Sequence, residues 1–135
     1  KTNPPPNLAC RCFTHSTETI LWAQKNDKKS RHFFDYQKMK EMNGGKQMKD
    51  VWTGALTKPS EKTEGKHPTQ KPEYLLEKIV LASTEDGQVI LDPFCGSGTT
   101  GVEAVRFGRK FIGIDISEEY LEISKRRLEK VANDK

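Results

Sequence analysis

The sequence predicts an α/β fold, one portion of a Rossmann-like, doubly wound parallel sheet. Two short apolar runs each end in an aspartate, Asp92 and Asp115. Between them lie a glycine-rich turn and enough chain for one helix. A strand, a crossover helix and a second strand pair in parallel with a right-handed crossover, and such sheets bind ligands at the carboxyl ends of their strands. We therefore expect a ligand site beside these two aspartates.

The regular elements of the second half are predicted from helix-end signals and apolar stripes. Pro72 suits a first helical turn, Gly108 ends a helix, and Ser117 is a good N-cap. Acidic residues follow Ser117 and basic residues come later, as the helix dipole favours. The predicted elements are a helix over 73–82, a strand over 89–91, a helix over 99–107, a strand over 111–114 and a helix from 118 to about 131.

The first half of the sequence is less regular. The apolar run from Thr19 to Ala23 predicts a buried strand, and the prolines at 4–6 require an extended or turning chain before it. From 24 to 66 the composition shifts to lysine, glycine and polar residues with aromatic islands, and no regular structure is predicted there. A span this long without periodicity is usually functional or disordered, and the aromatic residues argue against full disorder.

Charge is divided unevenly along the chain, although the net charge is only +4. Residues 1–72 hold 14 Lys or Arg against 7 Asp or Glu, whereas residues 73–135 hold 9 against 12. This asymmetry suggests that the first half faces a polyanion. A solvated, lysine-rich loop is the alternative that charge alone leaves open.

Cysteine usage and hydropathy indicate a reduced, intracellular setting. No run approaches the roughly 20 apolar residues of a membrane span, and no signal peptide opens the chain, so a cytoplasmic protein without membrane contact is expected. Cys10, Cys12 and Cys95 form no C-x-x-C pair, so neither a disulfide framework nor a metal site is predicted. Cys95 lies in the glycine turn, where a small side chain filling the turn is the favoured role over a nucleophile.

The glycine turn favours a cationic ligand over a phosphate. Gly96, Gly98 and Gly101 spell G-x-G-x-x-G, which taken alone suggests a dinucleotide. A carboxylate next to the turn, at Asp92, repels a pyrophosphate. S-adenosylmethionine carries a sulfonium and an ammonium but no phosphate, so acids at two successive strand ends suit it.

Three segments resemble the beta group of DNA adenine-N6 and cytosine-N4 methyltransferases. The run Asp92-Pro93-Phe94-Cys95-Gly96-Ser97-Gly98-Thr99 resembles their cofactor motif. His67-Pro68-Thr69-Gln70-Lys71-Pro72 resembles the motif that lies against the methionine part of the cofactor. Residues 7–23 resemble a late segment of the catalytic region, particularly in adenine enzymes of the MboII type. Only the C-terminal portion of such an enzyme is represented.

The resemblance implies a division of the chain into three parts. Residues 1–23 would end the catalytic region, 24–66 would be an inserted irregular DNA-recognition region, and 67–135 would bind S-adenosylmethionine in a methyltransferase sheet. The implied cofactor-binding residues are His67, Thr69, Gln70, Lys71, Asp92, Pro93, Phe94, Cys95, Gly96, Ser97, Gly98, Thr99 and Asp115. Of these, Asp115 would hold ribose hydroxyls. The Thr69 hydroxyl, the Gln70 amide and the Lys71 ammonium would face a carboxylate.

The 24–66 region holds 11 Lys or Arg against 6 acids, as a DNA-facing region requires. The expected DNA-binding residues are Lys28, Lys29, Arg31, Lys38, Lys46 and Lys49. Side chains that could reach base edges are Arg31, His32, Gln37, Asn43 and Gln47, with nothing in the sequence to choose among them.

No catalytic residue is predicted in the chain. Family members hold the target amine with Asp, Ser or Asn followed by two prolines and an aromatic residue, after removing the base from the duplex. Asn3-Pro4-Pro5-Pro6 is rejected as this motif because Pro6 has no aromatic face and the segment lies too late in the family's order. The expected partners are double-stranded DNA and a missing N-terminal catalytic portion in the same or a separate chain, and a homodimer is left open.

The resemblance implies methyl transfer to adenine N6 of DNA in a restriction-modification setting. The fragment alone is expected to be inactive. The alternatives are a cytosine-N4 enzyme, a non-catalytic fragment that binds DNA and cofactor, an RNA methyltransferase and an NAD-dependent oxidoreductase.

Overall fold

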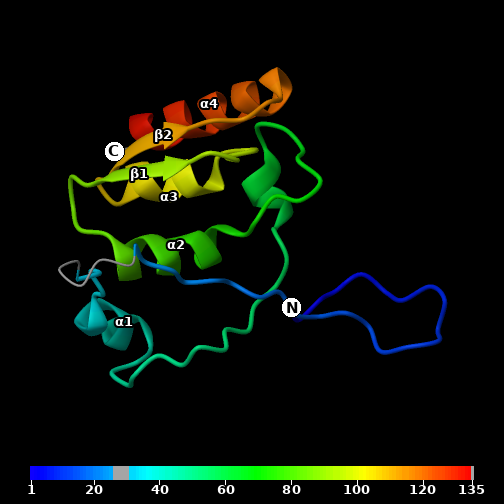
Figure 1. Ribbon diagram of the computed structural model, residues 1–135. Helices are drawn as coiled ribbons and strands as arrows, with labels where there is room; N and C mark the ends of the chain where they lie inside the picture. The colour runs from blue at the N-terminus through cyan, green and yellow to red at the C-terminus, as the bar shows by residue number, and fades with distance from the viewer. Residues whose placement is uncertain (26–30, 135) are drawn as a thin grey trace.

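The computed structural model describes residues 1–25 and 31–134. Lys28 and Lys29, two of the predicted DNA-binding residues, lie outside this range. The described elements are α1 (Tyr36–Met42), the 3-10 helix η1 (Pro59–Lys62), α2 (Glu73–Ser83), β1 (Val89–Asp92), α3 (Thr99–Arg106), β2 (Lys110–Gly113) and α4 (Glu118–Asn133), shown in Figure 1. None of the helices described is long and apolar enough to cross a membrane.

The predicted strand-helix-strand unit is present. β1 and β2 pair in parallel, with Ile90 opposite Phe111 and Asp92 opposite Gly113. The second strand begins one residue before the predicted range, because the Lys110 amide donates to the Gln88 carbonyl and extends the ladder. The described part of the doubly wound sheet predicted from the sequence is thus this parallel pair with its crossover helix.

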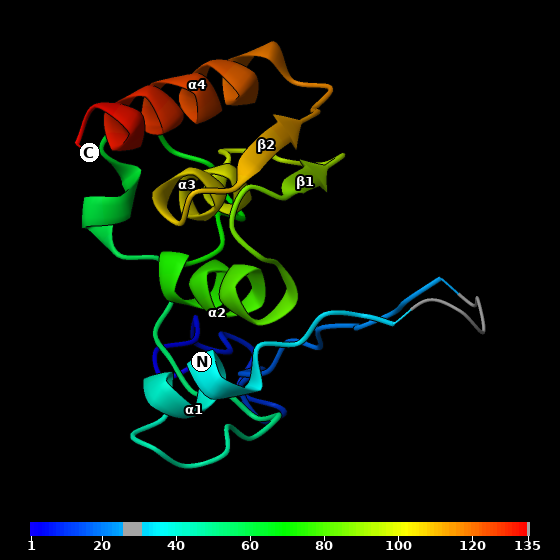
Figure 2. The ribbon, with the colours of Figure 1, turned by 90° about the vertical axis from the view of Figure 1, so that its left-hand side faces the viewer.

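Helix α3 forms the centre of a helical layer on one face of the strands. It contacts both strands and lies between α2 and α4, as Figure 2 shows. Its close approach to the sheet depends on Gly101, where a Cβ atom would lie 2.4 Å from the ring of Phe111. This glycine of the G-x-G-x-x-G pattern therefore serves helix-to-strand packing.

The other face of the strand pair is apolar and exposed. Val89 and Leu91 from β1 lie beside Ile112 and Ile114, and each is more than half exposed. Side chains alternate between faces along a strand, so these four are the residues that point away from α3. Parallel sheets are normally covered on both faces, and the described part of the chain covers only one.

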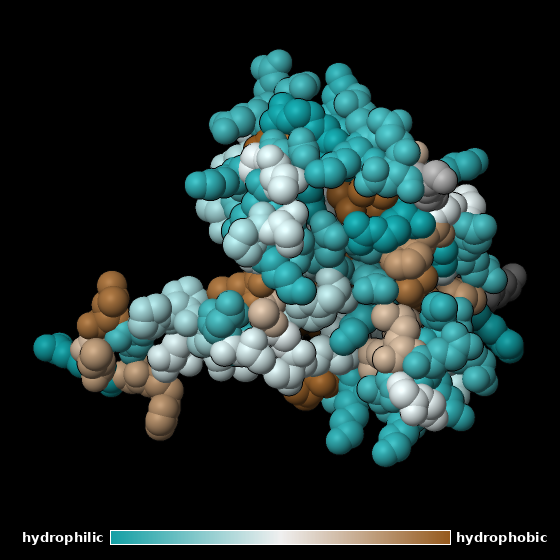
Figure 3. Space-filling model, turned by 180° about the vertical axis from the view of Figure 1, so that it is seen from behind, coloured by the Kyte–Doolittle hydropathy of each residue, from teal (hydrophilic) through white to brown (hydrophobic). Residues whose placement is uncertain are grey.

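The buried strand predicted over 19–23 is wrong. Residues 1–16 form a looped arm that projects from the helical body and is closed by the Lys1 ammonium, which donates to the Ser16 carbonyl at 2.6 Å. Residues 19–23 follow this arm outside any strand, and Leu21 is 89% exposed. Trp22 contacts His32 and Phe34 through ring edges and faces, but an apolar run becomes a strand only when a neighbour supplies backbone partners. Figure 3 shows the arm, with hydrophobic side chains near its tip, where Leu8 and Phe13 are exposed.

In its described part, the 24–66 region contains two short helices that the sequence did not predict. Asp35 caps α1 by accepting a hydrogen bond from the Lys38 amide at 2.8 Å. Met39 on α1 is buried against Leu81 and Ala82 of α2. A seven-residue helix with one buried side chain leaves too short an apolar pattern to detect.

Candidate functional site

A cavity of about 180 Å³ lies at the carboxyl end of the strands, where the sequence places a ligand site. Its lining is His67, Thr69, Gln70, Lys71, Leu76, Asp92, Phe94, Cys95, Gly96, Ser97, Thr99 and Thr100. The structure therefore brings both cofactor motifs to one cavity. Of the predicted residues, only Pro93, Gly98 and Asp115 do not line it. Leu76 and Thr100 line it without having been predicted.

Asp92 shapes the glycine turn with both carboxylate oxygens. Its Oδ1 accepts from the Phe94 amide at 3.1 Å, and its Oδ2 accepts from the Thr100 hydroxyl at 2.6 Å. The carboxylate thereby joins the end of β1 to the first turn of α3. Because a carboxylate oxygen has a second lone pair, Asp92 can still attract a cation in the cavity.

Asp115 holds the same turn from the second strand end. Its Oδ1 accepts from the Ser117 amide at 2.9 Å and its Oδ2 from the Gly96 amide at 2.8 Å. These two backbone hydrogen bonds lower the pKa of Asp115, so the group is ionised at neutral pH. The two carboxylates surround the turn with negative charge, which disfavours a phosphate ligand.

Two glycines of the turn adopt left-handed backbone angles. Gly96 has φ +51° and Gly98 has φ +73°. At Gly98 a Cβ atom would lie 2.1 Å from the Ser124 Oγ on α4. A side chain at this position is therefore opposed by both backbone strain and a clash.

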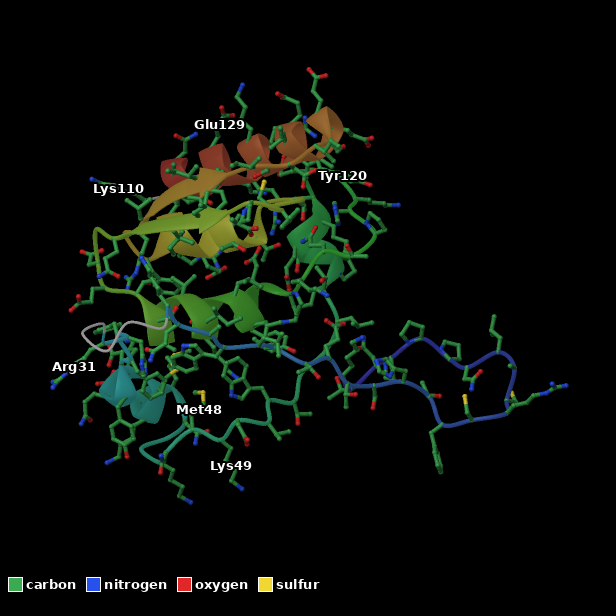
Figure 4. All side chains as sticks on the ribbon, in the orientation of Figure 1. Arg31, Met48, Lys49, Lys110, Tyr120 and Glu129 are labelled. Carbon is green, nitrogen blue, oxygen red and sulfur yellow. The ribbon has the colours of Figure 1, made fainter. Side chains whose placement is uncertain are left out.

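His67 packs directly over the turn. Its ring meets that of Tyr120 edge-on at a centroid distance of 4.1 Å, and Tyr120 is labelled in Figure 4. The His67 Nδ1 accepts from the Thr69 amide at 3.2 Å, so the neutral ring carries its proton on Nε2. A Cβ atom on Gly96 would lie 3.0 Å from that Nε2, so glycine gives the ring room to close over the turn.

Gln70 and Lys71, which are predicted to face a carboxylate, both make contacts within the chain. Gln70 is 8% exposed and its Nε2 donates to the Glu61 carbonyl at 2.7 Å, while its Oε1 has no partner in the described chain. That oxygen is buried within the chain. The Lys71 Nζ lies 2.7 Å from Glu18 Oε2, and hydrogen bonds from Lys1 and Lys71 lower the pKa of Glu18 to about 2.

Cys95 fills the turn, in agreement with its predicted role. The residue is buried and its amide donates to the Ile114 carbonyl at 2.9 Å. Burial, followed by the charges of Asp115 and Asp92, raises the pKa of the Cys95 thiol. A thiol kept protonated is a poor nucleophile. Within 1–25 and 31–134, no group of three His, Cys, Asp or Glu residues could hold a metal ion.

The described DNA-binding candidates gather around α1. Arg31, Lys46 and Lys49 are exposed, and the Lys38 Nζ lies 3.6 Å from Glu41. Figure 4 shows Arg31 and Lys49 on the far side of α2 from the sheet. The structure therefore separates these residues from the cavity at the strand ends.

Two of the base-edge candidates make contacts within the chain. The Asn43 Nδ2 donates to the carbonyls of Lys46 and Gln47, which closes the turn after α1. His32 Nδ1 lies 2.8 Å from Gln24 Oε1. Asn3, in the rejected proline motif, is also engaged within the chain. Its side-chain Oδ1 accepts a hydrogen bond from the Leu56 amide at 2.8 Å.

A network of charged side chains behind the turn, two of which are buried, was not predicted from the sequence. It comprises Glu73 on α2, Glu103 and Arg106 on α3, and Arg127 on α4. The available signal was position: Arg127 follows the buried Ile123 by four residues, so it occupies the inward face of α4.

Glu103 is expected to make stability depend on pH. The residue is fully buried, and burial raises its pKa to about 7 despite the neighbouring Arg106. Since the folded state holds a proton that the unfolded state has lost between pH 4.5 and about 7, the stability contributed by Glu103 should be greatest below pH 4.5 and be lost as pH rises through about 7, by on the order of 2 kcal/mol. Urea unfolding of wild type and Glu103→Gln at pH 5 and pH 8 measures this. The loss between the two pH values should be smaller in the variant, and equal losses would contradict the assignment.

Comparison with known proteins decides the family. A family model described as DNA methylase, for N6 and N4 methyltransferases, matches residues 1–126. The chain belongs to this family. It is 74% identical over 132 residues to the type II methyltransferase M2.LlaDCHI of Lactococcus lactis subsp. cremoris, covering 98% of the chain and 49% of that relative. It is 73% identical over 129 residues to M2.DpnII of Streptococcus pneumoniae, covering 96% of the chain and 48% of the relative.

A solved structure shares the fold. The crystal structure of the M1.HpyAVI-SAM complex matches 95% of the chain and 58% of its own, with a TM-score of 0.68 and 37% sequence identity. The resemblance to N6 and N4 DNA methyltransferases inferred from the motifs is thus confirmed. The chain spans about half the length of the curated relatives it matches.

Proposed function

We propose that the full-length protein transfers a methyl group from S-adenosylmethionine to adenine N6 of double-stranded DNA within a restriction-modification system. The described chain would supply the cofactor site and a DNA-facing surface. The observation that carries this proposal is the single cavity formed by the 67–71 loop and the 92–100 turn. Two family motifs that are distant in sequence meet there.

The chemistry of the cavity supports S-adenosylmethionine. Asp92 and Asp115 place two carboxylates around the turn, which favours a cationic ligand over a pyrophosphate. The M1.HpyAVI-SAM complex, a structural neighbour over most of the chain, was solved with that cofactor.

DNA as substrate is supported by charge and by the relatives. Basic side chains around α1 and the net positive first half suit phosphate contacts. The relatives that match along the whole chain are type II methyltransferases. The choice of adenine over cytosine depends on the resemblance of residues 7–23 to adenine enzymes.

Nucleoside analysis of DNA tests this proposal. DNA from a methylation-deficient bacterial host expressing the full-length gene would be digested and analysed by mass spectrometry. N6-methyladenine is expected. N4-methylcytosine instead would overturn the choice of base, and the absence of both modifications would overturn the proposed reaction. A host with the empty vector gives the background.

Asp115→Ala is expected to weaken S-adenosylmethionine binding by about 1–3 kcal/mol, or roughly 5- to 150-fold in Kd. The substitution removes a carboxylate that orders the Gly96 amide and that is proposed to hold ribose hydroxyls. Calorimetric titration measures the change. Glu119→Ala is the matched control, because Glu119 is an exposed acid at the start of α4. Unchanged affinity in a folded Asp115→Ala protein would remove Asp115 from the site.

A further inference from the structure

Arg127 is a buried cation that contacts the glycine turn from behind. It lies on α4 and is 5% exposed. Its Nη1 donates to the Ser97 carbonyl at 2.7 Å and to the Thr99 hydroxyl at 3.0 Å. Burying a guanidinium is costly unless it is paired and hydrogen-bonded, and these contacts supply part of that compensation.

Glu73 supplies the ion pair that the buried Arg127 guanidinium needs, and it connects Arg127 to the 67–72 cofactor motif. Its Oε1 lies 3.1 Å from the Arg127 Nη2. Glu73 begins α2 directly after Pro72, the last residue of the 67–72 motif. Two further contacts fix Glu73 in place. Its backbone amide donates to the Glu61 Oε2 at 2.9 Å, and its own Oε2 lies 3.0 Å from the Arg106 Nη2. A short path of charged groups thus joins the start of α2 to the turn at Ser97.

The same face of α4 closes against the turn at a second point. Ser124, one helical turn before Arg127, is buried and sits where a side chain on Gly98 would have to go. Neither Ser124 nor Arg127 lines the cavity. Their contacts therefore act on the shape of the turn, and no direct contact with the ligand is implied.

We propose that Arg127 is a positioning residue for the cofactor site. It holds the Ser97 carbonyl and Glu73 together, and so fixes the 67–72 loop and the 96–99 turn in the relative placement that forms the cavity. This inference rests on the proposed function for the identity of the ligand. Removing the guanidinium leaves both loops folded but frees one from the other.

Arg127→Met tests the proposal, with Arg109→Met as its matched control. Arg109 is also a largely buried arginine, with a side chain 11% exposed. It donates to the Thr84 carbonyl at 2.6 Å and to the Phe107 carbonyl, and it contacts neither cofactor loop. Each variant therefore loses a buried guanidinium and its carbonyl contacts, but only one loses contact with the turn.

Three measurements are made on each folded variant: urea unfolding, calorimetric titration with S-adenosylmethionine, and hydrogen exchange of a peptide spanning residues 93–99. Both variants should lose stability. Arg127→Met should weaken cofactor binding at least tenfold and accelerate exchange in the turn at least tenfold. Arg109→Met should change the affinity for S-adenosylmethionine and the exchange rate of the turn by less than twofold each.

The outcomes separate this inference from the proposed function. The role proposed for Arg127 would be overturned if Arg127→Met kept the wild-type affinity and the wild-type exchange rate. Equal losses of affinity in both variants would also overturn it. A wild-type chain that does not bind S-adenosylmethionine would count against the proposed function, while turn exchange would still decide the role of Arg127.

If Arg127→Met does not fold, Arg127→Lys decides, because one ammonium cannot span both Ser97 and Glu73. Its affinity should fall between wild type and a tenfold loss, and unchanged turn exchange in it would overturn the proposal.

Discussion

The 135-residue chain alone is expected to transfer no methyl group to DNA. Its sequence contains no Asp, Ser or Asn followed by two prolines and an aromatic residue, the motif by which the family holds the target amine. The nearest match, at Asn3, ends in Pro6, and the Asn3 side chain is engaged with the Leu56 amide. Radiolabelled S-adenosylmethionine with duplex DNA measures turnover.

Full-length M2.DpnII, assayed under the same conditions, is the positive control. A fragment of that relative comprising the part this chain does not match should restore transfer when mixed with the chain. The exposed apolar face at Leu91 and Ile112 is the surface we expect that fragment to cover. Turnover by the chain alone, above a boiled control, would show that the amine-binding groups are already present.

Gly98→Ala is expected to destabilise the chain by about 2–5 kcal/mol and to abolish measurable cofactor binding. An alanine at φ +73° carries a left-handed strain of about 1–2 kcal/mol. Its Cβ would also lie 2.1 Å from the Ser124 Oγ, and overpacking of this kind typically costs about 1–3 kcal/mol. Urea unfolding and calorimetric titration measure the two effects.

A double variant separates strain from clash. Removing the Ser124 side chain in Gly98→Ala/Ser124→Gly relieves the clash and leaves the backbone strain. Stability should therefore recover in part when compared with Gly98→Ala and the single Ser124→Gly variant. Full additivity of the two single substitutions would show that Gly98 and Ser124 do not interact.

The second half of the fold could be predicted because its signals are local. Pro72, Gly108 and Ser117 mark helix ends, and the strands are short apolar runs that end in acids. These signals place Asp92 and Asp115 at one edge of the sheet without tertiary information. The two carboxylates were correctly expected to surround the glycine turn, although Asp115 itself does not line the cavity.

Features that depend on tertiary partners could not be predicted in this way. The run at 19–23 has the composition of a strand but no backbone partner in the described chain, so Leu21 and Trp22 remain exposed. Gln70 is buried with its Nε2 donating to the Glu61 carbonyl, a contact between segments with no shared pattern. The spacing from Ile123 indicates that Arg127 faces inward, but not that it pairs with Glu73, which lies 54 residues earlier in the chain.

Calorimetric titration of the wild-type chain with S-adenosylmethionine and, separately, with NAD tests the central claim most directly. Two carboxylates around a glycine turn should favour a sulfonium ligand and repel a pyrophosphate. We predict saturable binding of S-adenosylmethionine and no measurable binding of NAD. Binding of NAD without binding of S-adenosylmethionine would contradict the account.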